Sequence, residues 1–300
     1  MKTTSLHLFR SVCLTAVLGL IISAGNAQPS PEAVGQPVKG EQPISVATLP
    51  EIPGALDLFV IDSNNHGQII GAYFDEDFNV FGFVYANGIY TMLDFEPQRI
   101  NDRGQIVGNT FDESTFLIHS FLYDQGTYTS IDFPGALEGG GFITGLNDRG
   151  QVLGIYSDGR NDHGFIYDKG IYTALPDVPG ARLTYPQSIN NLGQIVGWSY
   201  DSNLKSHSFF YENGVYTGID VPGAARGTYL SDINDKGQIV GISYDSAFNA
   251  HSFVYEKGDF TSIEIPDALV TSAYGINDRN QIIGTYYDAD FLPHGYVLSR

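Results

Sequence analysis

Aspartate and histidine recur at a regular spacing along this chain, and these residue types bind metal ions and transfer protons. Five to seven residues after the aspartate of a repeated segment, a histidine follows in five of six copies. The residues are Asp75, Asp112, Asp158, Asp201, Asp245 and Asp288, then His119, His163, His207, His251 and His294, with Phe81 in the first copy. The two rows suggest either metal ligands or acid–base pairs, or a hydrogen bond that each repeat needs for its own fold.

We favour the structural interpretation of these rows. Catalysis needs one asymmetric group of side chains, whereas a pair that occurs in nearly every copy meets a requirement of the repeat itself. Buried polar groups are normally hydrogen-bonded, so each aspartate is expected to hold the loop that precedes its histidine. No catalytic residue is assigned.

The elements that position these residues follow from a longer repeat. A segment close to Asn-Asp-x-Gly-Gln-Ile-Val-Gly occurs six times, in steps of 37 to 46 residues, with its glutamine at Gln68, Gln105, Gln151, Gln194, Gln238 and Gln281. This period indicates an array of similar supersecondary units. Short runs rich in Ile, Val, Tyr, Phe and Thr alternate with Gly or Asn-Asp turns, which predicts a four-stranded antiparallel meander in each unit.

The predicted strands are apolar on both faces, so each small sheet must be covered on both sides. Six such sheets form an all-β, six-bladed β-propeller, which we predict for residues 44–300. The last copy has only three strands before Arg300, so the N-terminal strand is expected to complete the last blade and remove a free sheet edge. A glycine in every second strand, such as Gly154, is expected to let neighbouring blades approach closely.

Residues 1–27 have the pattern of a secretory signal peptide, with Lys2 and Arg10 before an apolar stretch that contains the only cysteine, Cys13. Residues 28–43 are rich in Pro, Gly and Gln and are expected to be a disordered leader. We therefore predict a secreted or periplasmic protein.

The formal net charge of −19 bears on the choice of partner. Such a surface repels phosphate backbones, so nucleic acid is not expected as a ligand, whereas cations and basic partners are favoured. No apolar stretch after the signal is long enough for a membrane span, and we expect a monomer.

The repeats also resemble a known family. His-Ser-Phe at 119–121, 207–209 and 251–253, His-Gly-Phe at 163–165 and His-Gly-Tyr at 294–296, together with Ile-Asn-Asp-x-Gly-Gln-Ile-Val-Gly, look like the bacterial extracellular repeats called HAF. The resemblance covers roughly residues 44–300 and implies an exported repeat protein without an assigned activity. The first copy departs from the pattern at residues 81–83, where it reads Phe-Gly-Phe.

If repetition marks the scaffold, function should lie where the copies differ. The loops between the second and third strands vary, and five of them place an apolar residue three or four positions after the aspartate: Phe78, Phe116, Leu204, Phe248 and Phe291. These side chains either pack between blades or form an exposed rim that grips a sugar ring or a partner protein.

A second variable group is expected around the mouth of the central channel, on the same face of the disc. It contains Asp57, Glu138, Arg182, Tyr185, Arg226 and Tyr229, which could orient a polar ligand or form surface salt bridges.

The sequence favours an exported binding or scaffold propeller that recognises a glycan, a protein partner or a cation through its variable loops. The alternative is a hydrolase, lactonase or lyase with its site at the channel mouth, by analogy with other propellers. No cofactor is expected. The acidic loop at residues 75–77 is a weak candidate for Ca²⁺, because it lacks the mid-loop glycine and the bidentate anchor of a calcium loop.

Overall fold

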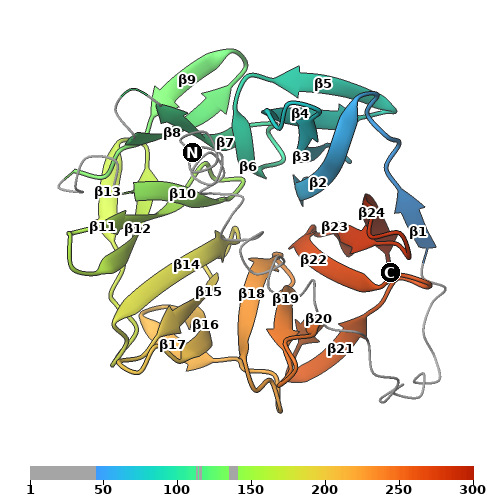
Figure 1. Ribbon diagram of the computed structural model, residues 1–300. Coiled ribbons are helices and arrows are strands. Elements are labelled where there is room, and N and C mark those ends of the chain that lie inside the picture. The colour runs from blue at the N-terminus through green and yellow to red at the C-terminus, as the bar shows by residue number, and fades with distance from the viewer. Residues whose placement is uncertain (1–44, 113, 115–116, 135–140) are drawn as a thin grey trace, which may run out of the picture.

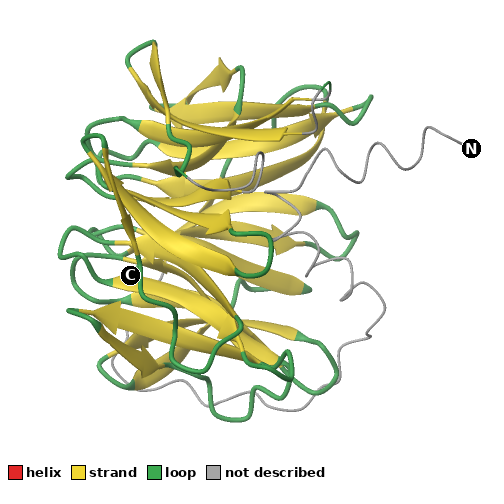
Figure 2. Cartoon of the chain, turned by 90° about the vertical axis from the view of Figure 1, so that its left-hand side faces the viewer, coloured by secondary structure: helices red, strands yellow, loops and turns green. Residues whose placement is uncertain are grey.

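The computed structural model describes residues 45–112, 114, 117–134 and 141–300. It confirms a six-bladed β-propeller of four-stranded antiparallel sheets. Figure 1 looks along the axis, around which the six sheets are arranged, and Figure 2 shows the disc turned by 90°. The described residues contain strands and loops but no helix.

The blades are numbered in chain order, and the first strand of each is the inner strand. Blade 1 contains β2 (Ala55–Ser63), β3 (Ile69–Asp75), β4 (Val80–Ala86) and β5 (Ile89–Leu93). Blade 2 contains β6 (Glu96–Ile100), β7 (Ile106–Asp112), β8 (Leu117–Asp124) and β9 (Thr127–Ser130). Blade 3 contains β10 (Gly141–Leu146), β11 (Val152–Ser157), β12 (Asp162–Asp168) and β13 (Ile171–Ala174).

The second half repeats this order. Blade 4 contains β14 (Leu183–Ile189), β15 (Ile195–Tyr200), β16 (Ser206–Glu212) and β17 (Val215–Gly218). Blade 5 contains β18 (Gly227–Ile233), β19 (Ile239–Tyr244), β20 (Ala250–Glu256) and β21 (Asp259–Ile263). Blade 6 contains β22 (Val270–Ile276), β23 (Gln281–Tyr287), β24 (Pro293–Ser299) and, from the other end of the chain, β1 (Ser45–Thr48).

The N-terminal strand closes the ring as the sequence predicts. β1 pairs antiparallel with β24, from Ser45 opposite Ser299 to Thr48 opposite Tyr296. In Figure 1 the first and last strands of the described chain lie side by side. The outer edge of β24 is therefore covered.

Turns at the two ends of the strands define two faces of the disc. The turns from first to second strand and from third to fourth strand lie on one face, which we call the tight-turn face. The loops from second to third strand, and those that lead from one blade to the next, lie on the other, which we call the loop face. The short Asn-Asp-x-Gly turns are thus separated from the variable loops by the length of a strand.

Hydrophobic clusters fill the spaces between blades, because each sheet is apolar on both faces. One cluster joins Val107 of blade 2 to Ile143, Val152 and Phe165 of blade 3, all of them buried. Equivalent clusters follow around the ring.

Each inner strand has a β-bulge opposite the glycine of the second strand. A Cβ on Gly154 would lie 2.5 Å from the Phe165 ring and 3.0 Å from the Phe142 carbonyl oxygen, both in its own blade. The interpretation of this glycine as a contact between blades was therefore wrong, because the crowding is within one sheet. Close approach between blades occurs at Gly164, where a Cβ would lie 2.8 Å from Pro186 of the next blade.

Candidate functional site

The repeated aspartates lie in the loops between second and third strands. Asp288 accepts hydrogen bonds at Oδ1 from the amides of Asp290 and Leu292, both at 2.9 Å. The same Oδ1 contacts with loop amides occur at Asp75, Asp158, Asp201 and Asp245. The side chain of Asp112 is not among those described. Each of these five carboxylates thus orders the loop that follows it.

Histidines contact the same carboxylates from the third strand. His294 Nε2 lies 2.8 Å from Asp288 Oδ2, and His251 Nε2 lies 3.3 Å from Asp245 Oδ2. The corresponding distances are 3.5 Å for His163 and Asp158 and 3.7 Å for His207 and Asp201. His119 is exposed.

Two of the histidines also contact a second carboxylate. His163 Nδ1 lies 2.9 Å from Asp177, and His207 Nδ1 lies 3.6 Å from Asp220. Because the two carboxylates approach opposite ring nitrogens, they do not converge on one ion. The described residues contain no group of three or more His, Cys, Asp or Glu side chains that could hold a metal.

These contacts shift the titration of both partners. The hydrogen bond from His294 holds the pKa of Asp288 below its usual value. Burial opposes the shift at Asp245, but hydrogen bonds from Asn249, His251 and Ala247 lower its pKa to about 2. Burial also lowers the pKa of His163, and the hydrogen bonds and charges of Asp177 and Asp158 outweigh it, so the net pKa is raised.

The apolar residues of these loops are exposed and are held in an unusual conformation. Phe78, Leu204 and Phe291 are 63%, 60% and 66% exposed, and Phe248 is 44% exposed. Their φ angles are 61°, 61°, 60° and 67°. Positive φ is rare for residues with large side chains and costs free energy, whereas the shorter loop of blade 3 has a glycine, Gly159, at positive φ. Phe116 lies outside the described residues.

The channel-mouth residues do not form one constellation in the described part of the chain. Tyr185 donates to Asp162 at 2.7 Å, and its ring stacks 6.1 Å from Trp198, which also contacts Tyr229 of the next blade. The Arg226 guanidinium lies 4.3 Å from the centre of the Phe248 ring.

The remaining members of this group are separate. Arg182 is exposed, and burial raises the pKa of the half-buried Asp57. The charge of Asp57 contributes, after burial, to raising the pKa of Tyr287 to about 12. Glu138 lies outside the described residues. The printed contacts thus link part of the mouth group to the rim, through Arg226 and Phe248.

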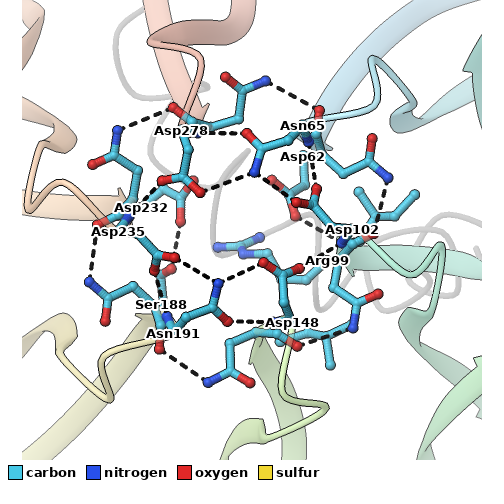
Figure 3. Close-up of a pocket in the computed structure, with 18 of the residues that line it drawn as sticks. Asp62, Asn65, Arg99, Asp102, Asp148, Ser188, Asn191, Asp232, Asp235 and Asp278 are labelled. Atoms are coloured by element: carbon cyan, nitrogen blue, oxygen red, sulfur yellow. Dashed lines mark hydrogen bonds between the residues drawn. The ribbon is translucent and has the colours of Figure 1, made fainter.

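The tight-turn face contains a polar cavity that the sequence analysis missed. It is lined by the Asn-Asp turns of the six blades and has a volume of about 70 Å³ (Figure 3). The second turn residue of each blade forms its rim: Asn65, Asp102, Asp148, Asn191, Asp235 and Asp278. We call these six residues the axial ring.

Hydrogen bonds join the axial ring into a closed circle. The backbone N–H of each member donates to Oδ1 of the member in the next blade, at 2.6 to 2.8 Å, and Asp278 donates back to Asn65. Asn65 Nδ2 also donates to Asp102 and Asp278, while Asn191 Nδ2 donates to Asp148 and Asp235. The two amides therefore lie between the four carboxylates in pairs.

The preceding asparagines form a second circle behind the first. Asn147 Nδ2 donates to the carbonyl of Asn190 in the next blade at 3.1 Å, and its Oδ1 accepts the amides of Arg149 and Gln151. The equivalent bonds between blades occur for Asn64, Asn101, Asn190, Asn234 and Asn277. The Asn-Asp-x-Gly-Gln motif is thus the element that fastens each blade to the next.

A charged layer lies deeper in the cavity, at the residue that follows each bulge. It contains Asp62, Arg99, Ser188 and Asp232. Arg99 extends from blade 2 to the carbonyls of Gln187 and Ser231, at 3.4 and 3.3 Å, in blades 4 and 5. Bulges commonly re-aim side chains in this way.

The acids of this layer are buried. Burial, followed by the charge of Asp232, raises the pKa of Asp62, while Arg99 and two backbone amides oppose the shift. Ser188 donates to Asp232.

One signal in the sequence could have pointed to this layer. Positions 62, 99, 145, 188, 232 and 275 precede the repeated asparagine by two residues, and they read Asp, Arg, Gly, Ser, Asp and Gly. Within an otherwise regular strand, this column differs between copies and contains three charges.

Comparison with known proteins identifies the fold alone. No family model matches the chain, and no curated protein is similar to it in sequence. Among solved structures, the β-propeller domain of the Trilobed protease from Pyrococcus furiosus is similar with a TM-score of 0.53 at 10% identity, over 81% of this chain and 94% of that one. An Aleuria aurantia lectin in complex with Fucalpha1-6GlcNAc gives a TM-score of 0.52 at 11% identity, over 81% and 93%.

A streptogramin B lyase gives a TM-score of 0.50 at 13% identity, over 84% of this chain and 87% of that one. Propellers with this architecture therefore include both binding proteins and enzymes. In the described residues, no helix is long and apolar enough to cross a membrane.

Proposed function

We propose that this protein is an exported binding module of the HAF-repeat type that recognises a glycan through its loop face. The observation that carries the proposal is the set of apolar side chains at positive φ on equivalent loops, Phe78, Leu204, Phe248 and Phe291. Exposed apolar residues alone are common on protein surfaces. A conformation that costs free energy and recurs in four blades is better explained by use of the side chain.

The groups beside these side chains suit a sugar. An aromatic face stacks against the apolar face of a sugar ring. Next to Phe78 and Phe248, the pairs Asp75 with Asn79 and Asp245 with Asn249 present carboxylate and amide groups that can hydrogen-bond to hydroxyls. The lectin with a bound sugar among the similar folds supports the proposal by analogy.

A glycan array with the full chain tests the proposal. The triple variant Phe78→Ser, Phe248→Ser, Phe291→Ser should lose binding to any glycan that the wild type retains, without loss of melting temperature. The matched control is Ile89→Ser, Ile171→Ser, Val215→Ser, which removes residues that are 67%, 69% and 62% exposed but lie in the outer strands. Equal loss of binding in the control, or no glycan bound by the wild type, would contradict the proposal.

One observation favours an enzyme as the second candidate. Burial raises the pKa of Glu96 to about 7, and this residue begins the inner strand β6 at the loop face. A carboxyl that titrates near neutral pH can act as a general acid or base. If so, Glu96→Gln should abolish turnover of a lactone, ester or glycoside substrate while binding persists.

A further inference from the structure

The axial ring contains more negative charge than its structural role needs. Its bonds between blades use one side-chain oxygen per residue, and Asn65 and Asn191 supply that oxygen as well as the aspartates do. Four carboxylates around one small cavity repel one another, so their presence lowers stability. Each carboxylate accepts one backbone and one amide hydrogen bond and retains acceptor capacity.

Arg99 provides an independent observation inside the same cavity. The residue is only 7% exposed, and Figure 3 shows its guanidinium within the outline of the axial ring. Its Nε–H has no hydrogen-bond partner among the described residues. An unsatisfied buried donor is costly, so this N–H calls for an acceptor within the cavity.

A metal ion does not satisfy both observations. No three acidic or histidine side chains of the described chain are arranged to hold one. A bare cation also offers no acceptor to Arg99. A primary ammonium, by contrast, has three N–H donors for carboxylates, and a neighbouring oxygen in the same molecule can accept from Arg99.

We propose that the axial ring binds a small ligand that carries a primary ammonium group beside an acceptor oxygen, such as an amino alcohol or an amino sugar. The ammonium lies among Asp102, Asp148, Asp235 and Asp278, and the oxygen accepts from Arg99 Nε. The site is on the tight-turn face and is independent of the loop face, so the glycan proposal and this one can fail separately.

Titration calorimetry of the full chain with ethanolamine tests the inference, with ethylene glycol, propylamine and CaCl₂ as comparisons. Ethanolamine should bind and weaken with added salt, ethylene glycol should not bind, and propylamine should bind more weakly because it lacks the oxygen. The double variant Asp102→Asn, Asp235→Asn keeps all six ring acceptors. It should lose about tenfold or more in affinity and should melt at a higher temperature without ligand.

Two further variants sharpen the test. Arg99→Lys removes the Nε–H and should reduce the affinity for ethanolamine to that for propylamine. Asn191→Asp adds a fifth charge and should increase the affinity for both amines. The inference is overturned if ethanolamine does not bind, if the double variant binds it unchanged, or if CaCl₂ binds and ethanolamine does not compete. Water alone then satisfies Arg99.

Discussion

The two faces of this propeller use the same blades in opposite ways. On the tight-turn face each blade supplies the same asparagine and an Asn or Asp, and neighbouring blades are joined into two closed circles of hydrogen bonds. On the loop face each blade supplies a loop of its own sequence, and Phe78, Leu204 and Phe291 project into solvent. The difference shows that one face is constrained by its neighbours, whereas the other is free to vary blade by blade.

The largest effect that would separate scaffold from loop face is expected from the closing strand. Deletion of residues 45–50 removes β1 and Leu49, which packs with Leu58, Val60 and Phe83. The edge of β24 becomes free and a cluster between blades 6 and 1 loses one wall, so cooperative unfolding should be lost and aggregation should appear. Thermal unfolding and light scattering measure this. An unchanged melting transition would show that the inner circles alone close the ring.

A single substitution in the second circle should come next. Asn147→Ala removes a side chain that is 4% exposed and leaves two amides and a carbonyl without their partner. The free energy of unfolding should fall by about 3 kcal/mol or more, measured in urea. Leu192→Ala is the control, because Leu192 is 61% exposed in the equivalent turn of blade 4 and should change stability by less than about 0.5 kcal/mol.

On the loop face the opposite sign is expected. Phe291→Gly relieves a φ of 60° at an exposed residue, so the protein should gain up to about 1 kcal/mol in stability. The same change should reduce glycan binding. A loss of stability above about 1 kcal/mol would mean that Phe291 packs against the fold and that the two faces differ less than proposed.

The smallest expected effect concerns pH. The pKa of His163 is raised in the folded protein, so its contacts with Asp177 and Asp158 contribute stability below the unfolded pKa, and this contribution is lost as pH rises through the folded pKa. His163→Gln should therefore lower the melting temperature more at pH 5 than at pH 8. The difference should be small because Asp158 and Asp177 are largely solvent-exposed. An equal effect at both pH values would contradict the assignment.

Much of the fold could be predicted from the sequence because it follows from local rules. The period, the Gly and Asn-Asp turns and the unfinished last copy predicted six blades closed by the N-terminal strand, and the pairing of β1 with β24 confirms this. The partner of the second-strand glycine could not be predicted, because it depends on a bulge that only the register shows.

The candidate sites were harder to predict for a different reason. The exposed state of Phe78 depends on a backbone torsion, and the sequence favoured neither packing nor exposure decisively. The axial ring was overlooked because Asn-Asp-Gly is a typical turn sequence, and a turn residue was assumed to serve its turn alone. Arg99 reaches carbonyls of blades 4 and 5, and such contacts across the axis have no local signal.

The closed circles on the tight-turn face also limit how this protein could change its size in evolution. All six bonds of the axial ring run in one rotational sense, from the N–H of one blade to the side chain of the next, and the sixth returns to the first. Duplication or loss of one repeat in the gene would alter the angle between neighbours, so every bond would have to be remade at once. Blade number should therefore change only by rare, concerted steps, while loops on the opposite face diverge freely.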